Sequence, residues 1–407
     1  MGMVIRKNYL DQLISWKDHD IIKVITGIRR CGKSTLLKQF QNYLKENGVM
    51  NDQIIFINFE DLQFESLMDY KNLYTYIVNK LLPDEKMYIF LDEVQKVPGF
   101  EKVVDSLYIK ENIDVYITGS NAYMLSSDLA TLLSGRYVEI SMLPLSFKEV
   151  YKEKGGDKEE VFYQYLKYGG FPYLITMALN DEQLNMYLEG IYNTVIIKDI
   201  EERENRKNVD SNKRKISNVV LLKSIAKYLA STVGSVISVK KVTGYLVSSG
   251  RKVSASTVDD YMEALKEAFI FYPVERFDVS GKKILKTLNK WYIVDLALRN
   301  FMLPKKTYDL GFSLENIIYF EWIRRGYRVS VGKTESSEID FVGQKNDEII
   351  YCQVTASMID PTTFEREMDP LRSIKDNYKK IVLTLDKVTL GNYEGIEVMN
   401  AIDWLLD

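Results

Sequence analysis

Short apolar runs that alternate with helical stretches dominate the first third of the chain. Between the first two runs, Leu36, Leu37, Phe40 and Leu44 recur at helical spacing, and a glycine ends the stretch. Strands that alternate with helices indicate a parallel sheet covered on both faces. The pattern therefore predicts an α/β core over residues 1–145, with strands at IIKVITG, QIIFINFED, KMYIFLDE, DVYITGSN and YVEISML.

Three further patterns follow along the chain. Residues 146–210 lack strand runs and are expected to form a helical lid around YGGFPYL, ending in a charged stretch that we interpret as a solvated linker. Residues 211–305 contain three helical stretches and then two apolar strands around a turn at SGKK, which is the order of a winged-helix module. Residues 306–407 mix helices and strands and predict a small α/β domain.

Composition narrows the class of protein. The 407 residues allow two or three domains with real cores, and the net charge of -3 leaves nucleic-acid contact to local patches. Cys31 and Cys352 are the two cysteines, too few for a disulfide framework and typical of a cytoplasmic protein. His19 is the single histidine, which argues against a zinc site or a Ser-His triad. No stretch resembles a signal peptide or a membrane span, so we expect no membrane contact.

The stretch GIRRCGKST follows the first strand and precedes the first long helix of the core. It matches the phosphate-binding pattern Gly-x4-Gly-Lys-Ser in full. In such a loop the backbone N–H groups face the phosphates, Lys33 reaches the β- and γ-oxygens, and Ser34 offers a hydroxyl to Mg²⁺. A glycine turn without a ligand is the alternative. We expect bound ATP and Mg²⁺, with the nucleotide held by Gly27, Arg30, Cys31, Gly32, Lys33, Ser34 and Thr35.

The run MYIFLDEVQ supplies the second half of this predicted site. Its strand delivers Asp92, which can hold Mg²⁺ with Ser34, while the adjacent Glu93 is the candidate base that orients the attacking water. After the neighbouring strand, Ser120 or Asn121 could contact the γ-phosphate or the water; a simple strand-ending turn at ITGSN is the alternative.

Arg136 in LSGRYVEI is a further candidate of this predicted site. It could reach the nucleotide of a neighbouring subunit as an arginine finger, or be a plain surface residue. Assembly into a homo-oligomer is therefore left open.

Several motifs together resemble the bacterial and archaeal AAA-type ATPases that carry a C-terminal domain of unknown function. They are IKVITGIRRCGKSTLL, IFLDEVQKVPGFEK, YITGSNAYMLS, LSGRYVEI, YGGFPYL and IYNTVIIKDI, and the resemblance extends over essentially the whole chain. The resemblance implies the P-loop fold and ATP binding, but no biological role. It also suggests that Pro172 of GGFP is similar to a lid proline that packs beside adenine; a helix-breaking turn is the alternative.

The resemblance also bears on the centre of the phosphate loop. Because the backbone binds the phosphates, we expect the side chains of Arg29 and Arg30 to point outward, and Cys31 needs only to be small. Two readings stay open at this point: a redox role for Cys31, and an ion pair between Arg30 and an acid of the lid.

The C-terminal half leaves DNA binding and protein binding open. The expected recognition helix SASTVDDYMEALKEA opens with Asp259 and Asp260, which repel phosphates. The residues that favour phosphate contact are Arg251, Lys252, Lys282, Lys283 and Lys286.

The last domain has the element order of restriction-endonuclease-like folds, with Glu315 on a helix and Asp340 on a strand. Nucleases of this kind hold Mg²⁺ with acids and use a lysine two residues after the second acid. Here Gln353 and Thr355 replace that acid and that lysine, although Lys333 lies nearby in sequence. We expect a nuclease-like fold that binds nucleic acid or protein without cutting.

The sequence thus predicts an ATPase whose nucleotide cycle repositions winged-helix and nuclease-like domains on DNA. A nucleotide-dependent scaffold or sensor that acts on a protein partner is the first alternative. An ATP-gated, metal-dependent nuclease is the second.

Overall fold

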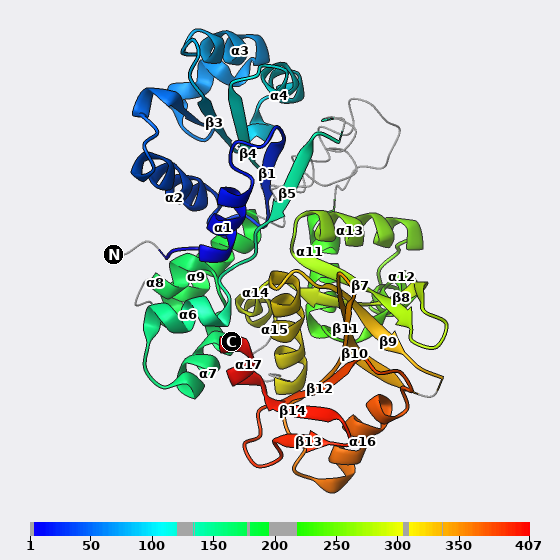
Figure 1. The fold of residues 1–407 in the computed structure, drawn as a ribbon. Helices are drawn as coiled ribbons and strands as arrows, with labels where there is room; N and C mark the ends of the chain where they lie inside the picture. The colour runs from blue at the N-terminus through cyan, green and yellow to red at the C-terminus, as the bar shows by residue number, and fades with distance from the viewer. Residues whose placement is uncertain are drawn as a thin grey trace. The chain divides into compact units, whose positions relative to one another are not determined.

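The computed structural model describes residues 4–119, 133, 135–176, 180–194, 218–303, 309–335 and 337–407 (Figure 1). They form two compact units. The first contains the described residues up to Pro144 and the short stretch Glu267–Phe269, and the second contains the others. Ser120 and Asn121, both candidates from the sequence, lie outside the described residues.

A parallel five-stranded sheet forms the centre of the first unit, as the sequence pattern predicts. The strand order is β2-β3-β4-β1-β5, and neighbouring strands pair in parallel throughout. Their carboxyl ends therefore meet at one edge, where the loops after β1 and β3 begin. The strands are β1 Ile22–Thr26, β2 Ile54–Asn58, β3 Met87–Asp92, β4 Ile113–Thr118 and β5 Tyr137–Ser141.

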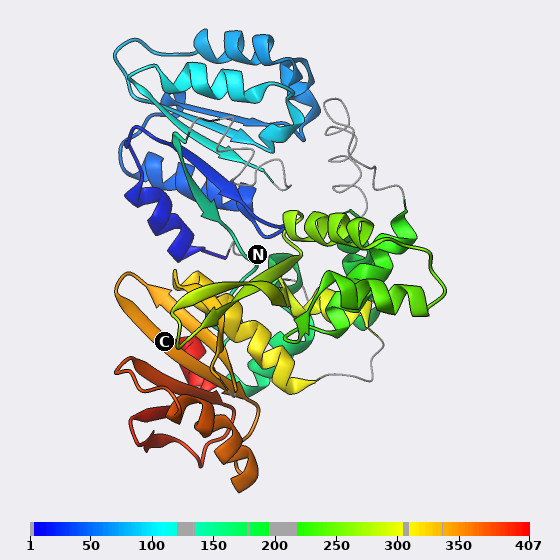
Figure 2. The ribbon, with the colours of Figure 1, turned by 90° about the vertical axis from the view of Figure 1, so that its right-hand side faces the viewer.

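Alternate residues of the strands divide the core of this unit between two faces. Ile89 and Leu91 of β3 belong to the apolar cluster that contains α3 and α4, whereas Phe90 between them contacts Phe40 of α2. Figure 2 shows the sheet between these two helical layers. The helical segments are α1 Lys7–Ser15, α2 Lys33–Glu46, η1 Asn51–Gln53, η2 Leu62–Met68, α3 Tyr70–Val78, η3 Val94–Lys96 and α4 Phe100–Tyr108.

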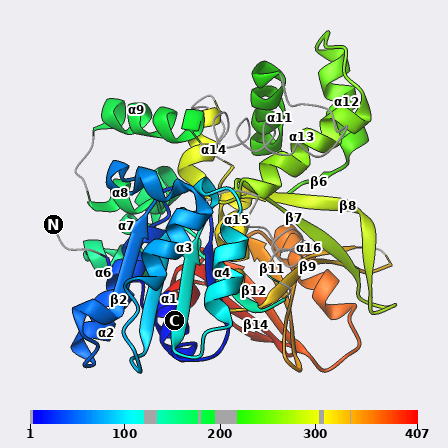
Figure 3. The same cartoon turned by 90° about the horizontal axis from the view of Figure 1, so that it is seen from above.

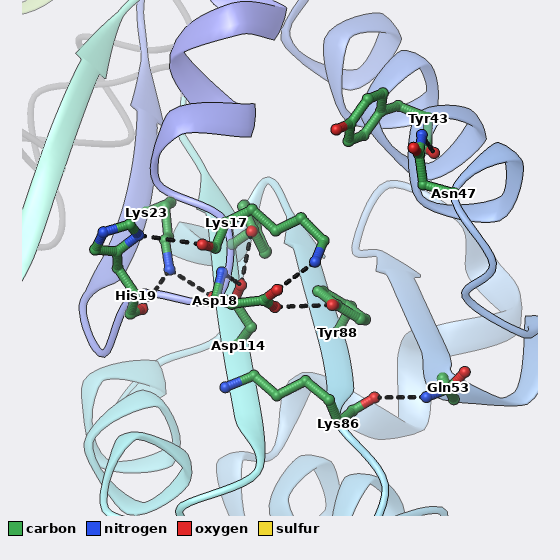
Figure 4. A network of polar contacts seen from close by, with 11 residues as sticks. Lys17, Asp18, His19, Lys23, Tyr43, Asn47, Gln53, Lys86, Tyr88 and Asp114 are labelled. Carbon is green, nitrogen blue, oxygen red and sulfur yellow. Dashed lines mark hydrogen bonds and ion pairs between the residues drawn. The ribbon is translucent and has the colours of Figure 1, made fainter.

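The amino ends of β1, β3 and β4 carry a buried polar network (Figure 4). Lys23 Nζ lies 2.6 Å from Asp114 Oδ1, and both side chains are 0% exposed. Asp114 Oδ2 accepts hydrogen bonds from the Asp18 N–H and the Tyr116 hydroxyl, and the Tyr88 hydroxyl donates to Asp18. This network lies at the end of the sheet opposite the phosphate-binding motif, and removal of either Lys23 or Asp114 would leave the other charge buried without a partner of opposite sign.

The second unit contains a mixed nine-stranded sheet of order β13-β14-β12-β11-β10-β9-β7-β8-β6. The hairpin that the sequence predicts as a wing joins this sheet, because β7 pairs in parallel with β9 (Figure 3). The strands are β6 Val236–Ile237, β7 Phe271–Asp278, β8 Lys283–Ile293, β9 Arg328–Lys333, β10 Glu338–Lys345, β11 Glu348–Thr355, β12 Lys379–Thr384, β13 Gly391–Tyr393 and β14 Ile396–Asn400.

Helices cover both faces of this second sheet. Tyr319 of α15 stacks on Tyr292 of β8, whereas Met368 and Leu371 of α16 belong to an apolar cluster with β10, β11 and β12. Three helices, α11 to α13, precede the hairpin, in the order expected of a winged helix; that assignment remains a prediction. The helices are α6 Phe147–Lys154, α7 Lys158–Tyr168, α8 Pro172–Thr176, α9 Asp181–Tyr192, α11 Val219–Ser231, α12 Val239–Ser248, α13 Ala255–Glu267, α14 Leu296–Met302, α15 Leu310–Arg324, α16 Pro361–Arg372 and α17 Ala401–Leu406.

The motif YGGFP has a structural explanation in the second unit. Gly169 has φ +66°, and a Cβ there would lie 1.9 Å from Asp295 Oδ1. Gly170 donates its N–H to Asp295 Oδ2 at 2.7 Å, and its own Cβ would lie 2.2 Å from the Leu145 carbonyl oxygen. Only glycine fits such close approaches. Pro172 then begins α8, at a helix position that proline favours, and its contact with adenine remains a prediction.

Among the helices of the described residues, none combines the length and the apolar character that crossing a membrane requires.

Candidate functional site

The loop between β1 and α2 depends on residues with positive φ. Gly27 has φ +138°, and a Cβ there would lie 2.1 Å from the Met142 carbonyl oxygen. Arg30 has φ 67°, and Gly32, with φ 107°, caps α2 without a side chain. The first N–H groups of a helix have no intrahelical partner, and a glycine cap leaves them open to a ligand. The loop thus has the backbone shape that phosphate binding requires.

Lys33 is buried and bends its side chain back over the loop. Its ammonium donates to the carbonyl oxygens of Gly27, at 3.0 Å, and Ile28, at 3.3 Å. It also lies 4.0 Å from Glu93 Oε1. The cation is therefore held inside the curve of the loop, next to the acidic end of β3.

Asp92 ends β3 and is 0% exposed. Its Oδ1 accepts a 2.6 Å hydrogen bond from the Thr118 hydroxyl, while Oδ2 is buried and has no hydrogen-bond partner among the residues described. Burial raises the pKa of Asp92, and the hydroxyls of Thr118 and Ser34 oppose this rise. A buried, unsatisfied carboxylate oxygen near a serine hydroxyl is a suitable donor set for Mg²⁺.

Glu93 follows in a left-handed turn, with φ 57° and ψ 45°. Its N–H donates to Thr118 Oγ1 at 2.9 Å, and its Oε2 accepts a 2.6 Å hydrogen bond from Gln95 Nε2. Such a backbone conformation costs a non-glycine residue about 1–3 kcal/mol and is often found at functional sites. The turn directs the Glu93 carboxylate toward Lys33 instead of along the strand.

Two residues of this site were not predicted from the sequence. The Thr118 hydroxyl donates to the Asp92 carboxylate and accepts the backbone N–H of Glu93; Thr118 ends β4, the strand that pairs in parallel with β3. Arg6 is 2% exposed and donates to the carbonyl oxygens of Cys31 in the loop and of Leu143 after β5. Arg6 therefore ties the phosphate-binding loop to the end of the first unit.

The side chains at the centre of the loop have different surroundings. Arg30 is exposed, as expected, but Arg29 is partly buried, with Nη1 3.9 Å from Glu60 Oε1. Cys31 is fully buried, and burial raises the pKa of its thiol, which disfavours the thiolate that a redox role needs. Thr35 lies in the first turn of α2 and is partly buried.

Arg136 lies away from this cluster within its own unit. Its carbonyl oxygen accepts the Ile22 N–H at the amino end of β1, whereas the phosphate-binding loop follows the carboxyl end of that strand. Its exposed guanidinium lies 5.3 Å from the Tyr108 ring. A role toward the nucleotide of a neighbouring subunit remains a prediction.

Some of the residues that the sequence suggests for a nuclease-like site lie close together in the second unit. Gln353 Oε1 accepts the Asp340 N–H at 2.7 Å, so the carbonyl that could have held a metal is already bonded. Thr355 donates its hydroxyl to the Ser357 carbonyl oxygen. Lys333 is exposed at the end of β9, whereas Lys290 of β8, which the sequence reasoning missed, contacts Glu315 and Asp340.

Comparison with known proteins places this geometry in a family. A model described as "AAA domain" matches residues 19–151, and one described as "Domain of unknown function (DUF8612)" matches residues 159–309. An uncharacterized protein of Haemophilus influenzae is 41% identical over 412 residues, covering 100% of this chain and 99% of that protein. An uncharacterized protein of Methanocaldococcus jannaschii is 29% identical and covers 94% of this chain and 85% of its own length.

A solved structure, the Walker-type ATPase paby2304 of Pyrococcus abyssi, matches with a TM-score of 0.49 at 15% identity, over 74% of this chain and 96% of its own. The likeness to the bacterial and archaeal relatives extends over nearly the whole chain, and the AAA model covers the parallel sheet with its phosphate-binding loop. The chain therefore belongs to the bacterial and archaeal family of AAA-type P-loop ATPases with a C-terminal domain of unknown function.

Proposed function

We propose that this protein binds ATP with Mg²⁺, hydrolyses it, and uses the nucleotide cycle to reposition its second unit on DNA. One observation carries the ATPase proposal. Lys33, Asp92 and Glu93 gather around the phosphate-binding loop, and the buried Asp92 Oδ2 has no partner among the described residues. An unsatisfied buried carboxylate oxygen is costly, and a cation ligand is the natural way to satisfy it.

In this proposal, different residues of the chain bind the phosphates, hold the metal ion and orient the water. The loop N–H groups bind phosphate oxygens, and Lys33 exchanges the carbonyls of Gly27 and Ile28 for the γ-phosphate. This exchange is favourable because the phosphate carries a full negative charge, whereas the carbonyl oxygens that Lys33 gives up are neutral acceptors. Ser34 and Asp92 would hold Mg²⁺, which neutralises charge on the phosphates when bound. Glu93 orients the attacking water and accepts its proton.

The partner of the second unit is the less constrained part of the proposal. Lys252, Lys282 and Lys283 are exposed and could contact a phosphate backbone. Asp259 and Asp260 are also exposed, on α13, and favour the second candidate function, a nucleotide-dependent scaffold for a protein partner. The free cysteines, both buried, agree with the cytoplasmic location that we propose.

One experiment tests the ATPase and another separates the two partners. Lys33→Ala should abolish ATP binding, measured by fluorescence titration with a labelled nucleotide, because the loop loses the ammonium that reaches the β- and γ-phosphates. Duplex DNA added to the wild-type protein should raise the rate of phosphate release, and the increase should fall steeply with salt. A rate unaffected by DNA, together with a protein captured by ATP-trapped Glu93→Gln, would favour the scaffold instead.

A further inference from the structure

Lys290 of β8 extends its ammonium into a group of three carboxylates. Its Nζ lies 3.0 Å from Glu315 Oε1, 3.0 Å from Glu338 Oε1 and 3.3 Å from Asp340 Oδ1. A lysine ammonium has three N–H donors, so each donor has one carboxylate partner. Lys290 is only 4% exposed, so water has little access to the ammonium, whereas the Glu338 side chain is 34% exposed at the rim of the group.

The three acids come from two elements, α15 and β10, and their remaining contacts also favour this arrangement. The Tyr292 hydroxyl donates to Glu315 Oε1, and the Val354 N–H donates to Asp340 Oδ2. Burial disfavours the charged ammonium, but the three carboxylates outweigh burial and raise the pKa of Lys290. The lysine is accordingly a permanent positive charge at the centre of the group.

A group of three carboxylates also offers the oxygen ligands that a divalent cation needs, at about 2.0–2.6 Å. Here the inward-facing oxygens are bonded to the ammonium. Gln353, which could have added a carbonyl ligand, donates to Glu367 and accepts the Asp340 N–H instead. With the acids arranged around the ammonium, the described part of the chain contains no group of three or more acidic, histidine or cysteine side chains placed to hold a metal ion.

We propose that Lys290 is the resident cation of this centre, an ammonium that takes the place of a divalent metal ion among Glu315, Glu338 and Asp340. The second unit then performs its role without metal chemistry, and any Mg²⁺ dependence of the protein arises in the first unit. Removal of the ammonium should convert the centre into a divalent-cation site. This inference is independent of the proposed ATPase cycle, because it concerns residues of the second unit alone.

The test is a Mn²⁺ titration of the full-length, nucleotide-free protein, with free Mn²⁺ measured by electron paramagnetic resonance. Lys290→Ala should bind one Mn²⁺ per chain at least about tenfold more tightly than wild type, and Mn²⁺ should raise its melting temperature more than that of wild type. Adding Asp340→Asn should abolish the gained site. Lys333→Ala removes an exposed lysine of the neighbouring strand β9 and should behave as wild type.

Two results would overturn the proposal. One is wild-type protein that binds Mn²⁺ at a site lost on Asp340→Asn, since the centre would then accept a metal beside Lys290. The other is a folded Lys290→Ala protein whose Mn²⁺ affinity equals that of wild type. If Lys290→Ala does not fold in EDTA, the comparison of wild type with Asp340→Asn decides alone. The proposal is then supported if the two proteins bind Mn²⁺ equally, because the wild-type centre holds no metal ion.

Discussion

Replacing Glu93 by glutamine removes one negative charge from the phosphate-binding site and leaves the size of the side chain almost unchanged. Glu93 is 7% exposed, so the substitution acts in a confined space between Lys33 and Gln95. The amide can still fill this space. It cannot accept a proton from water, and this is the property that hydrolysis requires.

The structure sets opposite expectations for binding and for turnover. At 4.0 Å, the attraction between Glu93 and Lys33 is about 4 kcal/mol for an effective dielectric constant of about 20. Removing this attraction releases Lys33 toward the phosphates, so the affinity for ATP should stay equal or increase. Loss of the base should slow turnover at least about a hundredfold, or about 2.7 kcal/mol in the barrier.

The assay pairs a nucleotide titration with phosphate release on the same Glu93→Gln preparation. Glu60→Gln is the matched control, because Glu60 is a nearby carboxylate that lies 3.9 Å from Arg29 and 3.7 Å from Lys96. It should retain wild-type turnover. If Glu93→Gln hydrolyses ATP within about tenfold of the wild-type rate, Glu93 is not the base and this assignment of the site is wrong.

Three other results are expected. Lys23→Met should lower the free energy of unfolding by about 3–5 kcal/mol, because Asp114 stays buried without its cation, while leaving ATP affinity unchanged; adding Asp114→Leu should recover most of the loss in urea denaturation. Burial raises the pKa of Asp295 to about 7, so the folded state keeps a proton that the unfolded state loses above about pH 4. Stability should therefore fall as pH rises from about 4 to 7 and level off above, and melting curves of Asp295→Asn should lack this component of the slope. Mixing Arg136→Ala with Glu93→Gln subunits should restore some turnover if Arg136 acts in trans; unchanged turnover of Arg136→Ala alone would argue against a finger there.

The sequence predicts local features of this fold well and distant contacts poorly. The strand, loop and helix around Lys33 follow from apolar runs and a motif that are continuous in sequence, and the acids Asp92 and Glu93 follow from the end of an apolar strand. The polar residues that the sequence suggests at this point, Ser120 and Asn121, follow the strand. The residue that contacts Asp92 and Glu93 is instead Thr118, the buried last residue of β4.

The contact of Lys290 with Glu315 and Asp340 shows a second limit of the sequence prediction. The spacing within CQVT indicates that the lysine of such nucleases is missing, because Thr355 stands at its position. A lysine nevertheless reaches the acids, from a strand 25 residues before Glu315 and 50 residues before Asp340. Register between distant strands decides such a contact, and periodicity within one strand carries no information about it.

The contacts of Arg6 also join residues that are distant in sequence, and they bear directly on the proposed nucleotide cycle. It is separated by 25 residues from Cys31 and by 137 from Leu143, yet it donates to both carbonyl oxygens. The Tyr9 hydroxyl accepts the Leu143 N–H, so Arg6 and the first turn of α1 hold this segment at two points, directly before the chain passes from the first unit to the second after Pro144. A loop that changes shape on binding phosphate must either carry Arg6 with it or give up a buried, charge-assisted hydrogen bond, which costs more than a neutral one. The cheaper outcome is that the loop and the segment before the second unit move together.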